Sequence, residues 1–415
     1  MSHADTEVVL VTERFHPDTT SSTGQYMTDL ATGLQERGTD VTVLTRKIRG
    51  HSDEDTQQRL DDAGVTVRRT PVPDVPQRSL LTRLCNWFTF LAFAVPMLLF
   101  SSPEQNREVV FVTYPSILPP LMWGVCRLKG WEYTYIVYDY YPEAAVELEY
   151  ISRGAVVHRL WQRCNQHLLV DARNIVALGP QMRQEIIDSV APKYEPEFDP
   201  DKIHIIHNWA NPEFITPRDK ADNWFAMKHN TQETFTLVYS GNIGEFHDLE
   251  TIVEGVAMLD DTECKALIIG EGNNKEAIRE LAARKGVLGE SVELLPYQPW
   301  EDVPYSFTAG DVSVVAVNPE FEGLCVSSKL YSALAAGQPV LVVAEESSDE
   351  AQIVEQFDAG VQVSPGDRQG FVEAIWEWQK NPELVEEQGK NAREAFEANF
   401  TKEHSVDEYH RVIAA

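Results

Sequence analysis

The sequence predicts an α/β protein with two doubly wound domains, because short apolar runs alternate with helical segments in two successive series. In the first series the runs are residues 7–12, 41–45, 108–113, 133–139, 174–178 and 202–208. In the second series the runs are residues 234–244, 265–272, 291–297, 311–317 and 339–344. Runs of this kind are typical of parallel strands buried on both faces by helices. Ligands of such folds bind beyond the carboxyl ends of the strands.

The first series opens with the strand EVVLVT, residues 7–12, and the loop FHPDTTSSTGQYM. The loop is long and polar for a connection from strand to helix, which hints at a function. From Gly24 onward, apolar residues recur on one helical face, and Gly38 ends the helix.

The polar stretch 208–223 separates the two series, so we expect an N-terminal domain at 1–207 and a C-terminal domain at 208–395. We expect the C-terminal helix, 396–415, to pack back on the N-terminal domain. A chain of 415 residues is long enough for two such domains.

The composition of the chain limits the classes of molecule that we expect it to bind and the compartment in which we expect to find it. A formal net charge of −30 argues against nucleic acid, because phosphate backbones are bound by basic patches. Acidic residues spread along the whole chain predict a halophilic source, where salt screens their repulsion. The five cysteines are scattered, and neither a disulfide framework nor a metal-ligand cluster is indicated. The start, MSHADTEVVLVTERF, does not resemble a signal peptide, so the cytoplasm is the expected location.

One segment, WFTFLAFAVPMLLF at 87–100, is apolar enough to suggest a membrane. It is shorter than the roughly 20 residues that span a bilayer, and Pro96 interrupts it. A buried core helix and a helix that dips into a membrane face are both open. Trp87 and the preceding Arg78 and Arg83 favour the second, so we expect a partly exposed apolar helix that contacts a membrane surface.

Three loops of the second series combine small residues with polar ones. Gly241 and Gly244 lie in YSGNIG, and Gly272 lies in IIGEGNNK, where glycine would let a phosphate approach the backbone. Lys329 follows the small residues of GLCVSSK at an expected helix start, which suits an anion such as a diphosphate. Tight turns without a ligand, and a solvated lysine, are the plainer alternatives.

The stretch YDYYPE places Asp139 and Glu143 near the end of a strand of the first series. Either the two side chains form a polar wall that faces the cleft, or Asp139 caps a helix and the neighbouring tyrosines pack in the core.

Taken together, these loops resemble the retaining glycosyltransferases of family 4, whose two Rossmann-like domains face each other across a cleft in the GT-B fold. The similarity covers essentially the whole chain. YDYYPE and IIHNWANPEF are similar to stretches of the N-acetylaminosugar transferase branch, although His207 stands where proline is usual. VSSKLYSALAAGQPVL resembles the family stretch P-S-K-x-x-E-Y-M-A-x-G-x-P-V.

The resemblance implies that one residue acts in catalysis, Asp139, and that no metal or other cofactor is needed. It implies that a nucleotide diphosphate-sugar is bound by a larger set: Gly24, Gly241, Asn242, Gly244, Gly272, Tyr297, Glu322, Ser327, Ser328, Lys329 and Ser332. Two departures concern glutamates of the family. Ser332 stands where a glutamate holds the donor ribose, and Leu324 stands where another holds the sugar, with Glu322 close by.

The predicted function is therefore a retaining hexosyltransferase that moves a sugar to a membrane-associated acceptor, such as a lipid-linked saccharide. The expected location is the inner face of the cell membrane. A sugar-nucleotide 2-epimerase of the same fold and a non-catalytic sugar-nucleotide-binding protein are the alternatives.

Overall fold

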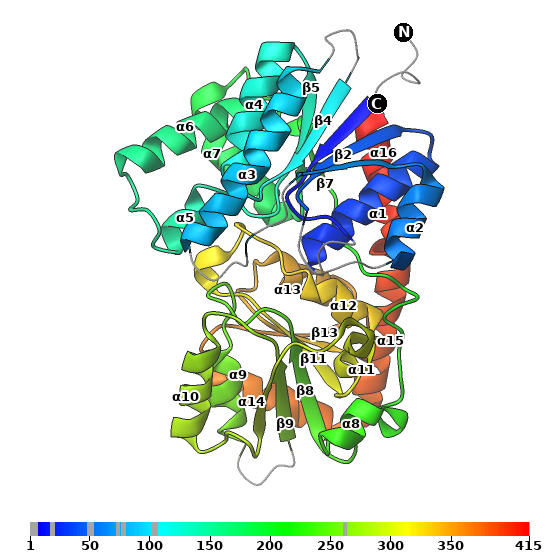
Figure 1. The fold of residues 1–415 in the computed structure, drawn as a ribbon. Helices are drawn as coiled ribbons and strands as arrows, with labels where there is room; N and C mark the ends of the chain where they lie inside the picture. Colours follow the sequence, from blue (N-terminus) through cyan, green and yellow to red (C-terminus); the bar gives the residue numbers. More distant parts are fainter. Residues whose placement is uncertain are drawn as a thin grey trace. The chain divides into compact units, whose positions relative to one another are not determined.

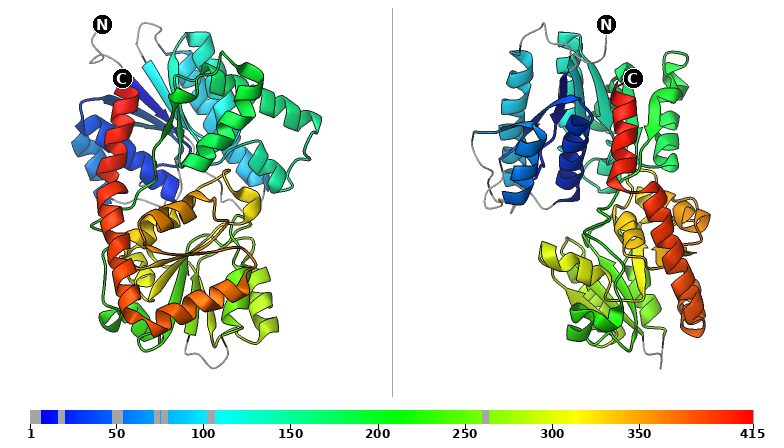
Figure 2. Two further views of the ribbon diagram at one scale, coloured as in Figure 1. Left: turned by 180° about the vertical axis from the view of Figure 1, so that it is seen from behind. Right: turned by 90° about the vertical axis from the view of Figure 1, so that its right-hand side faces the viewer.

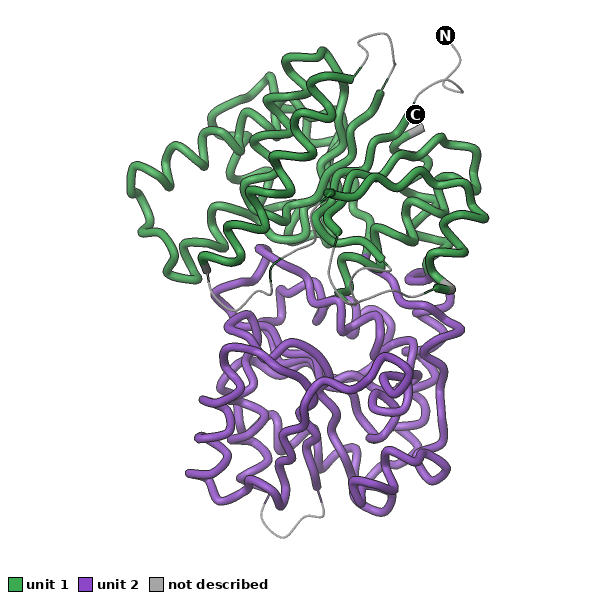
Figure 3. The backbone as a smooth tube through the Cα atoms, viewed as in Figure 1, with its two compact units in different colours: residues 1–207, 402–415 green, residues 208–401 purple. Residues whose placement is uncertain are grey.

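The structure, a computed structural model, describes residues 7–16, 21–47, 54–71, 75, 80–101, 107–259 and 264–414. The chain forms two compact units (Figure 3), of which unit 1 comprises residues 1–207 and 402–415 and unit 2 comprises residues 208–401. The boundary between His207 and Asn208 coincides with the expected one. The return to unit 1 comes at Lys402, six residues later than expected, because α15 (Pro382–Asn399) stays with unit 2.

Unit 1 is built on a seven-stranded parallel sheet in the order β3-β2-β1-β4-β5-β6-β7. The order of strands reverses between β1 and β4, so the carboxyl ends of these two strands form the topological switch point of unit 1. The strands are β1 (Glu7–Val11), β2 (Asp40–Thr45), β3 (Thr66–Arg69), β4 (Arg107–Val112), β5 (Glu132–Ile136), β6 (Asn174–Ala177) and β7 (Ile203–Ile205).

Helices cover both faces of this sheet (Figures 1 and 2). They are α1 (Ser22–Glu36), α2 (Glu54–Ala63), α3 (Leu80–Leu99), α4 (Leu118–Lys129), α5 (Glu143–Glu147), α6 (Val156–Asp171), α7 (Pro180–Tyr194) and α16 (Lys402–Ala414).

The C-terminal helix α16 packs beside α1 in unit 1, as the red and dark blue helices of Figure 2 show. The contact is close at Gly33, where an added Cβ would lie 2.5 Å from Cγ1 of Val406. An ion pair between Arg37 and Asp407, 2.6 Å from Nη2 to Oδ1, joins the two helices at the surface. These contacts explain why the last helix belongs to unit 1.

Unit 2 is built on a six-stranded parallel sheet in the order β10-β9-β8-β11-β12-β13, with its switch point between β8 and β11. Its strands are β8 (Phe235–Ser240), β9 (Cys264–Ile269), β10 (Val292–Leu295), β11 (Val312–Ala316), β12 (Val340–Val343) and β13 (Gly360–Val363). Besides α15, its helices are α8 (Trp224–Lys228), α9 (Glu250–Val256), α10 (Lys275–Lys285), α11 (Val303–Phe307), α12 (Lys329–Ala335), α13 (Asp349–Gln356) and α14 (Arg368–Lys380).

Two strands were not predicted from the sequence, and both are sheet edges. The residues of β3 alternate between exposed and half-buried, and three of the four residues of β13 are half-buried. An edge strand is covered less than a central one, so neither segment needs the continuous apolar run that marks the other strands.

The apolar segment of unit 1 is longer than its sequence suggests, because α3 starts at Leu80 and continues through Pro96. Within the described part of the chain, one segment, Leu81–Leu99, is long and apolar enough by length and composition to cross a bilayer, and 28% of it is buried in protein. Phe90 is fully buried, whereas Phe88 is 75% exposed. The helix is therefore partly exposed, as predicted.

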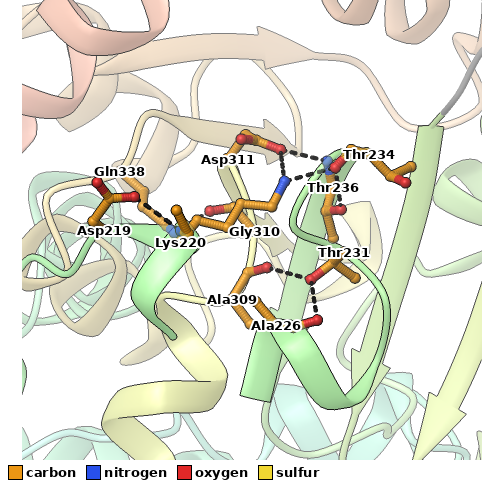
Figure 4. Close-up of polar contacts among 11 residues, drawn as sticks. Asp219, Lys220, Ala226, Thr231, Thr234, Thr236, Ala309, Gly310, Asp311 and Gln338 are labelled. Atoms are coloured by element: carbon orange, nitrogen blue, oxygen red, sulfur yellow. Dashed lines mark hydrogen bonds and ion pairs between the residues drawn. The ribbon is translucent and has the colours of Figure 1, made fainter. Parts of the chain in front are cut away.

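A polar anchor holds the amino ends of β8 and β11 in unit 2 (Figure 4). Lys220 donates from Nζ to Oδ2 of Asp311 and to the carbonyl oxygen of Thr234, both at 2.6 Å. The same Asp311 oxygen accepts the backbone N–H of Thr236 at 2.7 Å. One carboxylate thus connects the segment before α8 to two adjacent strands, at the edge of the sheet opposite its carboxyl ends.

Replacing Asp311 should destabilise unit 2 because the substitution leaves the partly buried Lys220 ammonium without its counter-charge. We expect Asp311→Ala to lower the free energy of unfolding by about 2–4 kcal/mol. Urea denaturation of the full chain measures the change, with Asp222→Ala at an exposed position of the same segment as the control. Equal midpoints for the two variants would show that the anchor contributes little.

Candidate functional site

Two loops of unit 2 are bound together at the switch point between β8 and β11. Asn318, after β11, donates its backbone N–H to the carbonyl oxygen of Phe246 at 2.9 Å. Its side-chain Nδ2 donates to the carbonyl oxygen of Glu245 at 3.1 Å. The rings of Phe246 and Phe321 lie 4.3 Å apart. The loop after β8 and the segment after β11 therefore form one rim at the carboxyl edge of the sheet.

Lys329 extends its side chain over the glycine loop of this rim. A Cβ added to Gly241, whose φ is +151°, would lie only 2.2 Å from Cε of Lys329. The Lys329 ammonium lies 5.2 Å from the centre of the Tyr239 ring, a favourable distance for a cation on an aromatic face. Gly241 is thus required here for the passage of the lysine stem as well as for its backbone conformation.

His247 holds the Lys329 ammonium in place. Its Nδ1 lies 2.8 Å from the carbonyl oxygen of Ala316, the last residue of β11, so Nδ1 carries the proton and donates it. The other nitrogen, Nε2, therefore has a free lone pair and accepts from Nζ of Lys329 at 2.9 Å. Burial, and then the Lys329 charge, hold the pKa of His247 well below its usual range, which keeps the ring neutral.

The charge of Lys329 is also set by its surroundings. Burial lowers the pKa of Lys329 to about 8, and the nearby Cys325 and Glu350 oppose this shift. The ammonium form of Lys329 therefore predominates at neutral pH, although its pKa lies only slightly above that pH. An ammonium has three N–H donors, and one of them donates to His247. The other two can donate to the oxygen atoms of an anion.

The segment before Lys329 also contains a buried hydroxyl, that of Ser327. The backbone N–H of Ser327 donates to the carboxylate of Glu350, on α13. The Oγ of Ser327 is buried and has no hydrogen-bond partner among the described residues. Burial raises the pKa of Glu350 to about 7, and the Ser327 N–H opposes the shift. An unpaired buried hydroxyl is costly, and a ligand oxygen would satisfy it.

The start of α12 adds less positive charge to the site than the sequence suggested. α12 begins at Lys329 but has only seven residues, and the preceding Ser328 makes no side-chain capping bond within the described structure. A helix of two turns has a weak dipole. The positive charge of the site therefore rests mainly on the Lys329 ammonium.

The glycine turns have a structural role that the sequence analysis did not foresee. An added Cβ at Gly270 would lie 1.8 Å from the carbonyl oxygen of Gly241, and one at Gly272 would lie 2.0 Å from that of Ile243. At Gly244 it would lie 2.6 Å from Nδ2 of Asn242. Close contact between backbones thus explains Gly270 and Gly272, and phosphate binding at Gly272 stays a prediction.

The other residues predicted for the donor occupy the same edge with different exposure. Tyr297 follows β10 and is 54% exposed, whereas Ser332 is half-buried on α12. Glu322 accepts from Oγ of Ser347 at 2.8 Å, so its carboxylate is directed toward the start of α13. Leu324, at the position of the family glutamate, is buried. The two positions at which the family has glutamates, Leu324 and Ser332, therefore carry no carboxylate.

Two of the predicted residues belong to unit 1. Gly24 lies in the first turn of α1, where its N–H donates to Oγ of Ser21 at 3.2 Å. Asp139 follows β5, and burial raises its pKa to about 6. Pro142 occupies the N-cap position of α5, so helix capping does not explain Asp139.

Glu143 does not form the polar wall that the sequence left open. Its side chain is directed toward α6, where it accepts from Nε2 of Gln162 at 3.1 Å, and the residue is 8% exposed. The hydroxyl of Tyr140 is likewise directed inward and bonds to Ser189. The packing alternative therefore holds for these two side chains, and Asp139 is left as the carboxylate near the strand end.

Sequence reasoning missed His247 and Glu350. His247 stands inside the stretch YSGNIGEFHDLETI, but a lone histidine in a loop has no spacing that reveals a partner far along the chain. Glu350 follows Ser348 at the start of α13, where an acidic residue is ordinary. Among the described residues, no group of three or more His, Cys, Asp or Glu side chains is arranged as metal ligands.

Comparison with known families agrees with this architecture. Residues 22–209 match the family described as Glycosyl transferase 4-like domain, and residues 221–395 match the family described as Glycosyl transferases group 1. The two matches cover one unit each. The chain therefore belongs to the family 4-type glycosyltransferases with the GT-B fold.

Relatives and solved structures are distant but extend over most of the chain. The putative colanic acid biosynthesis glycosyl transferase WcaI of Escherichia coli is 22% identical over 400 residues, 93% of this chain and 94% of that protein. The probable glycosyltransferase WbjE of Pseudomonas aeruginosa is 23% identical over 67% of each chain. The structure of Anabaena HepE with UDP and glucose has a TM-score of 0.72 at 13% identity, covering 99% of each chain.

Proposed function

We propose that this glycosyltransferase moves a hexose-type sugar from a nucleotide diphosphate-sugar to a saccharide acceptor carried on a membrane lipid, with retention of anomeric configuration. The observation that carries the proposal is the Lys329 ammonium, which His247 holds over Gly241 at the switch point of unit 2. Parallel α/β sheets bind ligands at this place, and a diphosphate needs a positive charge there.

The similar proteins support the choice of donor and process. HepE was solved with UDP and with UDP-glucose, and WcaI is named for colanic acid biosynthesis. We therefore infer a uridine nucleotide as donor and a role in building an envelope polysaccharide on the cytoplasmic face of the membrane. Membership of the N-acetylaminosugar transferase branch rests on the YDYYPE and HNWANPEF stretches.

In the proposed reaction, unit 2 stabilises the leaving group of the donor. When the bond from sugar to phosphate breaks, negative charge grows on the phosphate oxygen, and donors already aimed at it lower the barrier. Lys329 supplies the charge, and the unpaired Ser327 hydroxyl supplies a hydrogen bond. His247 adds no charge of its own and orients the ammonium.

Asp139 is the group of unit 1 that we assign to the acceptor. A carboxylate with a pKa of about 6 is ionised at neutral pH and is more basic than an ordinary aspartate. It therefore suits removal of a proton from an acceptor hydroxyl, or stabilisation of positive charge that develops on the sugar.

Helix α3 is the part of unit 1 that we propose to touch the membrane. Leu81, Leu84 and Phe88 recur on one helical face and are 70%, 45% and 75% exposed. Apolar side chains so exposed in a row mark a surface for lipid or for a partner. Phe90 is fully buried and serves the core instead.

The charge of the surrounding helices favours anionic lipid as the occupant of this surface. The chain has 65 acidic and 35 basic residues, yet α3, α4 and α6 reverse this ratio. Their charged residues are Arg83, Arg127, Lys129, Arg159, Arg163 and Asp171, of which Arg127 and Asp171 pair with each other. The excess of positive charge therefore comes from Arg83, Lys129, Arg159 and Arg163. In a chain with a net charge of −30, such a basic region attracts the negative surface of a cytoplasmic leaflet.

Removing the charge of Lys329 should weaken diphosphate binding. We expect Lys329→Met to bind UDP about 10- to 150-fold more weakly than wild type and to bind uridine equally, because a charge-assisted bond contributes about 1.5–3 kcal/mol. Calorimetric titration measures both affinities. Lys390→Met, at an exposed lysine of α15, is the matched control. Unchanged UDP affinity in Lys329→Met would refute the assigned role.

The affinity for UDP should also depend on pH through Lys329. The ammonium is the binding form, so the affinity should fall as pH rises through the pKa of about 8. In Lys329→Arg the side chain stays charged, so its affinity should not fall in this range. Identical pH profiles for the two proteins would contradict the assignment.

Replacing Asp139 should separate transfer from donor binding. We expect Asp139→Asn to keep the UDP affinity and to lose about 100-fold or more in transfer rate, the usual contribution of a positioned acid or base. In wild type the rate should rise with pH through about 6 as Asp139 ionises, and the variant should lack this rise. Asp188→Asn, at an exposed aspartate of α7, is the control, and an equal loss there would remove the case for Asp139.

Membrane binding should depend on the outward face of α3. We expect the double variant Leu81→Ser, Phe88→Ser to lose flotation with vesicles of phosphatidylglycerol and phosphatidylcholine, because it removes exposed apolar contact area without opening the core. Met227→Ser, at an exposed apolar residue of unit 2, should float like wild type. Unchanged flotation of the double variant would mean that α3 does not contact lipid.

A further inference from the structure

Four side chains of unit 1 form a row outside the donor site, in which two adjacent aromatic rings lie between two cations. The Arg14 guanidinium lies 5.0 Å from the centre of the Tyr114 ring. The Trp87 ring meets Tyr114 edge-on at 5.6 Å, and its Nε1 donates to the Tyr114 hydroxyl at 3.2 Å. The Arg83 guanidinium lies 5.4 Å from the centre of the Trp87 ring. The row therefore runs Arg14, Tyr114, Trp87, Arg83.

The row lies where a doubly wound sheet offers a ligand site. Arg14 follows β1 and Tyr114 follows β4, and these neighbouring strands are the ones between which the strand order reverses. Arg83 and Trp87 are one turn apart on α3 and complete the row. β1, from the start of the chain, and the consecutive elements α3 and β4 thus bring the four side chains to the switch point of unit 1.

The two arginines of the row lack the carboxylate partners that most of the other described arginines of this unit have. Within the described part of the chain, neither Arg14 nor Arg83 forms an ion pair, although acidic residues outnumber basic ones almost two to one. The Nε of Arg83 is buried without a described hydrogen-bond acceptor. In contrast, carboxylates pair with Arg37, Arg46, Arg59, Arg107, Arg127, Arg153 and Arg173.

An anionic ligand would satisfy these groups. A buried guanidinium N–H without an acceptor is costly, and a phosphate oxygen is its best match in geometry and charge. The Tyr114 hydroxyl accepts from Trp87 and so keeps its own proton for a further oxygen. The faces of Tyr114 and Trp87 are suited to the apolar side of a sugar ring or to the start of a lipid chain.

The row lies near two other proposed features of unit 1, the carboxylate of Asp139 and the exposed apolar face of α3. Asp139 follows β5, which pairs with β4, so it lies at the same carboxyl edge of the sheet as Tyr114. Burial and then the charge of Asp139 raise the pKa of Tyr141, and the charge of Arg83 opposes this shift. The exposed residues Leu81 and Phe88 lie on α3 beside Arg83 and Trp87. A ligand on the row would therefore lie between the proposed catalytic carboxylate and the proposed lipid-facing surface.

We propose that Arg14, Tyr114, Trp87 and Arg83 bind the phosphate-linked end of the acceptor, namely a phosphate or diphosphate ester joined to a sugar. The inference deepens the proposed function and rests on it. It assigns the recognition of the anionic group to the two arginines and the contact with the adjoining sugar or lipid to the two rings.

The test uses the full chain with Lys329→Met, so that the proposed donor site does not compete for the probes. Calorimetric titrations compare farnesyl diphosphate, N-acetylglucosamine 1-phosphate and uncharged farnesol. The variants are Arg14→Gln, Arg83→Gln and Arg83→Lys. The matched control is Arg127→Gln, because Arg127 also lies over an aromatic ring, Trp123 at 5.9 Å, but pairs with Asp171.

We expect the parent to bind one or both phosphate esters and each Gln variant to bind them about 10- to 100-fold more weakly. Arg83→Lys should recover part of the loss, and farnesol should respond to none of the variants. Binding of farnesyl diphosphate alone indicates a lipid-borne acceptor, and binding of the sugar phosphate alone indicates a soluble one. Both results support the site.

The proposal is overturned if the parent binds neither ester, if both Gln variants bind like the parent, or if Arg127→Gln weakens binding as much as they do. Thermal unfolding of each variant shows whether the fold is intact. Because UDP and an active Lys329 are absent, these outcomes do not depend on the donor assignment, which the UDP titrations of wild type test separately.

Discussion

The hydrogen bond between Lys329 and His247 is the interaction on which the proposed donor site depends. It joins the loop after β8 to the start of α12, and the bond from His247 to Ala316 extends the link to the end of β11. The lysine stem crosses directly over Gly241, so the glycine loop, the histidine and the lysine restrict one another. A neutral imidazole orients the ammonium without cancelling its charge, which leaves that charge for an anion.

Each unit has, at the switch point of its sheet, a cation that forms no ion pair among the described residues. Each sheet is parallel, each reverses its order once, and each presents a cation over an aromatic ring at that point: Lys329 over Tyr239 in unit 2, and Arg14 over Tyr114 in unit 1. In a chain with a net charge of −30, cations that form no ion pair among the described residues are candidates for binding anions. A transferase that binds two phosphate-linked substrates, a donor and an acceptor, would use both Lys329 and Arg14.

The sequence predicted the two sheets well because buried central strands are continuous apolar runs, whereas the edge strands β3 and β13 were missed because they are half-covered. The glycine loops and Lys329 were recognised from small residues near strand ends and from the family resemblance. His247, Glu350 and the row from Arg14 to Arg83 were not, since each depends on side chains that meet only after folding. The reason for Gly270 and Gly272, close contact between two backbones, likewise has no signal in the sequence.

A crystal structure of the chain with UDP tests the central claim most directly, because it shows where the diphosphate lies. The account predicts a diphosphate oxygen within hydrogen-bond distance of Nζ of Lys329, about 2.7–3.2 Å, with His247 still bonded to the same ammonium. It also predicts that Oγ of Ser327 gains a partner. A diphosphate held elsewhere, with the contact between Lys329 and His247 unchanged and facing no ligand, would contradict it.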